Sequence, residues 1–180
     1  LDPFCGRGTS VYCAARQGRF ATGIEINEIG WIYSSVKLNP APLRSVLNRI
    51  SELYVLSQDI EREEEMHEFF DLAYCPDVLN FLLAARSHLK WKTRKTDTTV
   101  MAIILHYLHG KLGEGLSNQF RQTKCFSPDY SVEWWKDNNF SPPLINPKDF
   151  LKKRIEWRYQ KGRPKFIHSE ALFGDSTKLL

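Results

Sequence analysis

The residues best suited to chemistry stand at the start of the chain, in a loop with two closely spaced glycines. Residues 2–9 read Asp-Pro-Phe-Cys-Gly-Arg-Gly-Thr. Gly6 and Gly8 allow tight bends and let a ligand approach the main chain, and the helix expected next directs free N–H groups toward that ligand. A dinucleotide-binding loop needs a third glycine where Val11 stands, and the Gly-Lys-Ser/Thr of a Walker loop is absent. The loop therefore fits neither phosphate-binding motif.

Three acidic residues predict the remaining contacts of a ligand. Asp2 opens the loop, where a carboxylate suits an ammonium group. Glu25 ends an expected strand, where a carboxylate suits ribose hydroxyls, and Asp175 ends another, where it suits an adenine amino group. S-adenosylmethionine, with an amino-acid end and a nucleoside end, matches this order. The alternative is an ordinary turn at Gly6 and Gly8, with Glu25 and Asp175 as helix caps.

The elements that position these acids follow from local sequence patterns. We expect a helix capped by Thr9 or Ser10 that runs to about Gln17, a strand over 20–26, a helix over 28–38 and a returning strand over 171–175. A glycine-containing loop, a helix and a strand with a terminal acid form half of a nucleotide-binding α/β unit. The sequence therefore predicts the α/β class.

A long segment of helical periodicity separates the two strand patterns. Apolar residues recur at helical spacing from Val46 to Tyr54. Further helices are expected to begin at Pro76, at Asp97 or Thr98, at Ser127-Pro128 and at Asn146-Pro147. We therefore expect an α/β start over 1–42, a helical insertion over 43–164 and a return to the α/β domain over 165–180.

The chain resembles the DNA amino-methyltransferases, which form N4-methylcytosine or N6-methyladenine. Residues 2–9 (DPFCGRGT) and 21–27 (ATGIEIN) are similar to the family's F-x-G-x-G-T loop and G-I-E/D strand end. One branch of bacterial site-specific enzymes is also similar farther along, at Leu116–Gln119 (LSNQ), at Pro128–Tyr130 with Trp134-Trp135, and at Gly174-Asp175.

The resemblance implies a partial Rossmann-like class I methyltransferase sheet interrupted by a large, mainly helical insertion that contacts DNA or recognises the target. It implies S-adenosylmethionine as cofactor, with Phe4 against its methionine part. The cofactor-binding residues are then Asp2, Pro3, Phe4, Cys5, Gly6, Gly8, Thr9, Glu25, Ile26, Asp175 and Ser176. The implied reaction is direct methyl transfer to an exocyclic amine of adenine or cytosine, as in cytoplasmic restriction-modification systems.

The main departure concerns the family's catalytic motif, Asp/Asn/Ser-Pro-Pro followed by an aromatic residue. Ser141-Pro142-Pro143 invites the assignment, but Leu144 follows it and has no ring to stack on a flipped base. The polar residues Asp137-Asn138-Asn139 precede it instead of an apolar strand. We interpret Ser141-Pro142-Pro143 as a helix-to-helix turn. The catalytic residues are then unknown and expected beyond Leu180 or on a second polypeptide, and the isolated chain is expected to be inactive.

The clustering of basic residues along the chain favours a polyanionic partner more strongly than the net charge does. Lys and Arg number 25 against 21 Asp and Glu, a net charge of +4. Basic blocks at Arg86–Lys95 and Lys148–Lys165 include Trp91 and Trp157, which suits double-stranded DNA; solvated helix faces are the alternative. The candidate DNA contacts are Lys90, Lys92, Arg94, Lys95, Lys152, Lys153, Arg154 and the amides of Asn118 and Gln119, which can also cap helices.

Other classes of protein fit the sequence less well. The longest apolar run, Val100 to Leu105, is too short to cross a membrane. The four cysteines form no Cys-x-x-Cys pair, and His106 and His109 have no third ligand in view, so we expect reduced thiols and no metal site. The first residues, Leu1-Asp2-Pro3, lack an initiating Met and read as the interior of a longer chain.

Two further functions stay open at this point. A truncated or split module that binds DNA or a partner chain would need no catalytic motif, and an RNA methyltransferase could share the loop. An incomplete sheet exposes an edge strand. We therefore expect self-association or a second polypeptide that supplies the remaining strands.

Overall fold

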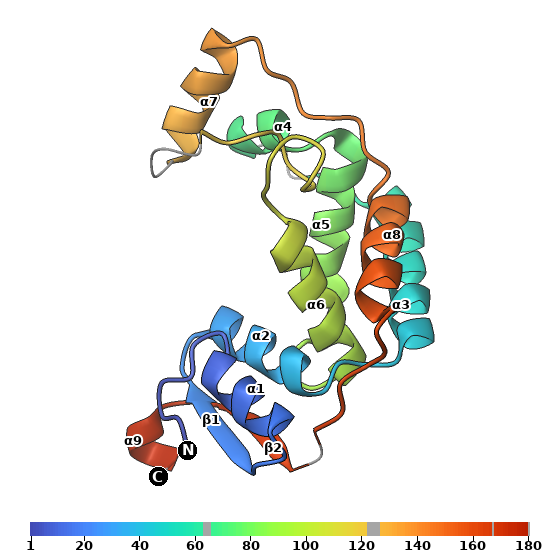
Figure 1. The fold of residues 1–180 in the computed structure, drawn as a ribbon. Helices are drawn as coiled ribbons and strands as arrows, with labels where there is room; N and C mark the ends of the chain where they lie inside the picture. Colours follow the sequence, from blue (N-terminus) through green and yellow to red (C-terminus); the bar gives the residue numbers. More distant parts are fainter. Residues whose placement is uncertain (63–65, 122–126, 167, 180) are drawn as a thin grey trace. The chain divides into compact units, whose positions relative to one another are not determined.

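The computed structural model describes residues 1–62, 66–121, 127–166 and 168–179. The chain forms two compact units (Figure 1). Unit 1 comprises Leu1–Val46, Lys90–Ala102 and Glu156–Leu180, and unit 2 comprises Leu47–Leu89 and Ile103–Ile155. The limits fall within α3 (Leu43–Leu56), directly after Leu89, within α6 (Lys95–Tyr107) and near the end of α8 (Pro147–Tyr159). Within the described ranges, no helix is both long and apolar enough to cross a membrane.

Unit 1 contains a small parallel sheet. β1 (Ala21–Glu25) pairs with β2 (Ser169–Phe173), and Glu25 lies opposite Phe173. On the other side of β1, Asp2 forms a parallel bridge with Gly23. The Asp2 N–H donates to the Thr22 carbonyl at 2.9 Å, and its carbonyl accepts from the Ile24 N–H at 2.9 Å. The predicted α/β class is confirmed. Across the sheet, the extended segments lie in the order β2, β1 and the segment of Asp2.

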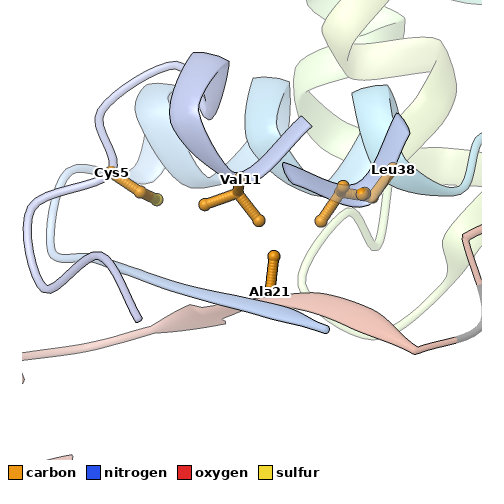
Figure 2. Close-up of a cluster of buried hydrophobic side chains, with 5 residues drawn as sticks. Cys5, Val11, Ala21 and Leu38 are labelled. Atoms are coloured by element: carbon orange, nitrogen blue, oxygen red, sulfur yellow. The ribbon is translucent and has the colours of Figure 1, made fainter. Parts of the chain in front are cut away.

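Helices α1 (Thr9–Arg16) and α2 (Glu28–Leu38) pack against this sheet (Figure 1). Figure 2 shows side chains of the core beneath them, which includes Cys5, Val11, Ala21 and Leu38. A Cβ at Gly23 would lie 2.7 Å from Val11 Cγ2 and 2.8 Å from Cys5 Sγ. Only glycine therefore lets the loop and α1 pack this closely on β1.

The segment Lys90–Ala102 groups with the strands of unit 1, although the sequence placed it in the insertion over 43–164. The Ala41 N–H donates to Thr99 Oγ1 at 2.9 Å. Lys92 forms an ion pair of 2.7 Å with Glu28 on α2. These contacts join residues distant in sequence, which local patterns cannot reveal.

Unit 2 is helical in its described residues. Besides parts of α3, α6 and α8, it contains a 3-10 helix (Ser57–Asp59), α4 (Phe69–Ala73), α5 (Pro76–His88) and α7 (Pro128–Asp137). α4 packs against α7. Trp135 is fully buried there, with its ring centroid 5.5 Å from Phe69 and 5.1 Å from Phe120. An aromatic cluster therefore forms the centre of this packing.

Most of the helix starts predicted within 43–164 are confirmed, but one is wrong. Pro76 begins α5, Ser127 caps α7 by accepting from the Tyr130 N–H at 3.3 Å, and Asn146 accepts from the Asp149 N–H at the start of α8. α6, however, begins at Lys95 instead of Asp97 or Thr98. The Asp97 side chain is buried and accepts from the Lys90 N–H at 2.9 Å, so it stabilises the preceding loop.

Candidate functional site

An open depression lies where β1 and β2 end, in unit 1. Its cavity volume is about 160 Å³, smaller than the ~300–1,000 Å³ typical of small-molecule sites. Two of its lining residues, Ile24 and Gly174, were not among the predicted cofactor-binding residues. The other six were predicted to bind the cofactor: Pro3, Phe4, Glu25, Ile26, Asp175 and Ser176.

Glu25 joins the glycine loop to the end of β1. Its Oε2 accepts from the Gly6 N–H at 2.7 Å, and its Oε1 accepts from the Asn27 N–H at 2.7 Å. A Cβ at Gly30 would lie 2.8 Å from Glu25 Cγ, so glycine is needed there. A carboxylate offers about four acceptor positions. Glu25 is thus fixed in place and keeps capacity for a further donor.

Asp2 is engaged by its own loop, and this corrects the expected cap of α1. Its Oδ1 accepts from the Phe4 N–H at 3.1 Å, and its Oδ2 accepts from the Ser10 hydroxyl. The N-cap of α1 is Gly8, in the left-handed conformation, instead of Thr9 or Ser10. The expected cap is wrong because the Ser10 hydroxyl bonds to Asp2.

The two glycines of the loop have different roles. Gly8 has a φ of +72°, and a Cβ there would lie 2.5 Å from Ser34 Cβ on α2. Gly6 has a φ of +52°, and a Cβ there would meet nothing within 4 Å. Gly8 therefore permits the close approach of α2, whereas open space beside Gly6 leaves room for a ligand.

Substituting Gly8 tests this distinction. Gly8→Ala combines a left-handed backbone, disfavoured by about 1 kcal/mol, with an overlap that costs a further ~1–3 kcal/mol. Gly18→Ala is the matched control, because Gly18 has a φ of +75° and open space around its Cβ position. We expect Gly8→Ala to lower the free energy of unfolding by more, as measured by urea denaturation. Equal losses would contradict the packing of Ser34 on Gly8.

Asp175 and Ser176 close the other side of the depression. Asp175 Oδ1 accepts from the Thr177 N–H at 3.0 Å and from the Thr177 hydroxyl at 2.8 Å, at the start of α9 (Ser176–Leu179). These bonds fit the alternative interpretation of Asp175 as a helix cap. Asp175 also lines the depression. Phe4 and Ile26 are 81 % and 67 % exposed. Their apolar surfaces are available to apolar parts of a ligand.

Five predicted cofactor residues do not line the depression although they belong to its loop: Asp2, Cys5, Gly6, Gly8 and Thr9. The Cys5 thiol lies in the core, and burial raises its pKa. The Cys5 N–H donates to the Ile24 carbonyl at 3.0 Å. Cys5, Cys13 and Cys75 are free thiols, and Cys125 lies outside the described residues. Cys5 therefore contributes to the packing beneath the loop.

The predicted DNA contacts fall in both units. Lys90, Lys92, Arg94 and Lys95 are exposed in unit 1, and Lys152 and Lys153 are exposed on α8 in unit 2. Arg154 instead lies over the rings of Tyr107 and Phe150, 5.5 Å and 5.2 Å from their centroids. Arg154 is thus partly committed to packing, while the six others are available to solvent.

Asn118 and Gln119 were predicted as base-reading residues, and the structure places the first in the interior. Asn118 is 1 % exposed. Its Nδ2 donates to the Leu72 carbonyl at 3.0 Å, and its Oδ1 accepts from the Gln119 N–H at 2.9 Å. The Gln119 carbonyl accepts from the Trp135 indole at 2.6 Å. Asn118 therefore acts as a structural residue here, and its amide is not available to base edges.

Ser141-Pro142-Pro143 lies in the irregular connection between α7 and α8. The segment follows α7, not a strand, and Leu144 is 92 % exposed. This placement matches a connection between helices.

No protein-family model, curated protein sequence or solved structure matches this chain. Among the residues that the structure describes, no three His, Cys, Asp or Glu side chains gather where they could hold a metal ion. The function therefore has to be argued from the loop, the two strand ends and the charges around them.

Proposed function

We propose that the depression at the ends of β1 and β2 binds S-adenosylmethionine. The chain would form the cofactor-binding part, with a helical insertion, of a DNA amino-methyltransferase that acts on adenine or cytosine. One observation carries this proposal: Glu25 holds the glycine loop through Gly6 and lines the same depression as Asp175. Carboxylates at the ends of two parallel strands suit a nucleoside.

The order of the strands supports a Rossmann-like sheet. If the segment of Asp2 counts as the first strand, the order β2, β1, Asp2 corresponds to 3-2-1 in a doubly wound sheet. Ligands of such sheets bind outside the carboxyl ends of the strands. The depression lies at those ends of β1 and β2.

The charges around α1 favour S-adenosylmethionine over a dinucleotide. A diphosphate would bind the N-terminus of this helix, but the Asp2 carboxylate already bonds to Ser10 in its first turn. Glu25 adds a second carboxylate beside the loop. Val11, at the position of the third glycine, is 2 % exposed and packed in the core. A ligand with an ammonium group suits this surrounding better than a dianion does.

Each group of the cofactor has a proposed partner. Asp2 would attract the ammonium group, the main chain at Gly6 would face the carboxylate, Glu25 would accept from the ribose hydroxyls, and Asp175 would accept from the adenine amine. When bound, S-adenosylmethionine supplies an electrophilic methyl group. The residues that would orient the target amine are not assigned in this chain.

Calorimetric titration tests the proposed ligand. Titration with S-adenosylmethionine, or with its demethylated product, is expected to give a heat of binding that saturates at one molecule per chain. NAD, which shares the adenosine part but carries a diphosphate, serves as the matched control. Tight NAD binding with no response to S-adenosylmethionine would overturn the proposal.

The isolated chain is expected not to methylate DNA. It lacks a Pro-Pro-aromatic segment to accept hydrogen bonds from the target amine and to stack on the base. Incubation with labelled S-adenosylmethionine and mixed genomic DNA measures incorporation directly. Incorporation that disappears in Ser141→Ala would instead place the catalytic motif at Ser141-Pro142-Pro143.

A further inference from the structure

A second hollow lies in unit 1, between α2 and the segment that leads into α6. It shares no lining residue with the depression around Glu25. The residues that line it combine aromatic, hydroxyl and basic side chains: Trp31, Ser35, Val36, Asn39, Lys92, Thr93, Lys95, Thr98 and Thr99. Such a mixture suits a small polar ligand with negative charge.

Ser35 supplies a hydrogen-bond donor that the fold does not use. Its Oγ is buried and has no partner in the described part of the chain. A helical serine commonly donates to a carbonyl one turn earlier, but Ser34 Oγ already donates to the Trp31 carbonyl at 3.0 Å. A buried hydroxyl without a partner is costly and calls for an explanation. A ligand oxygen in the hollow would satisfy it.

The two lysines that line the hollow differ in their pairing. Lys92 forms an ion pair with Glu28 and lies over the Trp91 ring, 4.9 Å from its centroid. Lys95 Nζ contacts the Asn39 amide oxygen at 2.5 Å, and no described carboxylate lies within ion-pair distance of it. Partial burial, with Arg163 and Lys165 nearby, lowers the pKa of Lys95. The surplus of positive charge favours an anion.

The threonines fix one wall of the hollow. Thr98 Oγ1 donates to the Trp91 carbonyl at 2.6 Å, and Thr99 Oγ1 donates to the Lys95 carbonyl at 2.9 Å. Their protons are therefore used within the segment. This leaves Ser35, the Asn39 amide NH₂ and the two lysines as side-chain donors for a ligand.

We propose that this hollow binds a phosphate group, with Lys95 supplying charge and Ser35 a hydrogen bond. The phosphate could belong to a nucleic-acid backbone or be free in solution, and the rings of Trp31 and Trp91, 6.3 Å apart, make its binding visible by fluorescence. The proposal does not depend on S-adenosylmethionine, because no residue is shared with that site.

Two titrations of the full chain test the proposal. In one, a short labelled duplex is followed by fluorescence anisotropy at several salt concentrations; in the other, inorganic phosphate is followed by tryptophan fluorescence. Lys95→Ala is expected to weaken the binding of the duplex and of inorganic phosphate. It is also expected to reduce the salt dependence of duplex binding by about one phosphate contact. Lys111→Ala removes an exposed lysine of unit 2 that is not a predicted DNA contact and is expected to leave both titrations unchanged.

Ser35→Ala separates ligand binding from folding. Because the hydroxyl has no partner, its removal is expected to leave Tm unchanged or higher, while phosphate affinity falls. Loss of phosphate binding with unchanged duplex binding would assign the hollow to free phosphate, and loss of both would assign it to the nucleic-acid backbone. If neither Lys95→Ala nor Ser35→Ala changed either titration, or if Lys111→Ala changed both as much as Lys95→Ala did, the hollow would not be a phosphate site.

Discussion

Glu25→Ala is expected to weaken S-adenosylmethionine binding by roughly 100-fold or more. The change removes the proposed acceptor of the ribose hydroxyls and the bonds of 2.7 Å that hold Gly6 and Asn27. Hydrogen bonds to charged groups contribute ~1.5–3 kcal/mol each, and every 1.4 kcal/mol is about tenfold in affinity. Two such bonds therefore account for the expected loss, which calorimetry measures.

Two further variants keep this prediction falsifiable. Glu25→Gln retains one oxygen acceptor but introduces an NH₂ group opposite the N–H of Gly6 or Asn27, so we expect an intermediate affinity. Glu170→Ala removes an exposed acid of β2 outside the depression and is expected to bind normally. Circular dichroism checks that each variant is folded. Equal heats from the wild type and a folded Glu25→Ala would remove Glu25 from the site.

The largest effect on stability is expected from Trp135→Ala in unit 2. Trp135 is fully buried, its indole donates to the Gln119 carbonyl at 2.6 Å, and its ring packs on Phe69 and Phe120. Removing a buried aromatic side chain costs ~3–5 kcal/mol, and the Gln119 carbonyl loses its donor. Urea denaturation followed by circular dichroism is expected to show this loss.

Trp157 provides the matched comparison for this prediction. It is also a helical tryptophan, but its surface is 64 % exposed. Trp157→Ala is therefore expected to change the free energy of unfolding by roughly 0.5 kcal/mol or less. Similar losses from the two variants would contradict the aromatic cluster as the centre of unit 2.

Local chemistry explains which parts of the fold could be predicted. α2 begins and ends as expected, over Glu28–Leu38, because Asn27 accepts from the N–H groups of Ile29 and Gly30 and Pro40 follows. β1 falls within the expected 20–26 and ends at Glu25. In α2, the deciding contacts are made by near neighbours in sequence, and in β1 the local residue types already favour a strand.

Contacts between distant residues explain what could not be predicted. The Trp31 indole donates to the Ala171 carbonyl at 2.9 Å, which joins α2 to β2 across 140 positions. Similarly, Asn118 is buried because Leu72 accepts from its amide, and no local pattern separates it from an exposed asparagine. The short helices α4 and α9 span only five and four residues, too few for an apolar period.

Amide chemical-shift mapping tests most directly whether the depression binds S-adenosylmethionine. The ¹⁵N-labelled chain is titrated with the cofactor, and the amide signals of both units are followed. We predict the largest shifts at Gly6, Glu25, Ile26 and Asp175, with unit 2 unaffected. Saturating cofactor that leaves these four signals in place, or that shifts only the signals of unit 2, would contradict the proposed site.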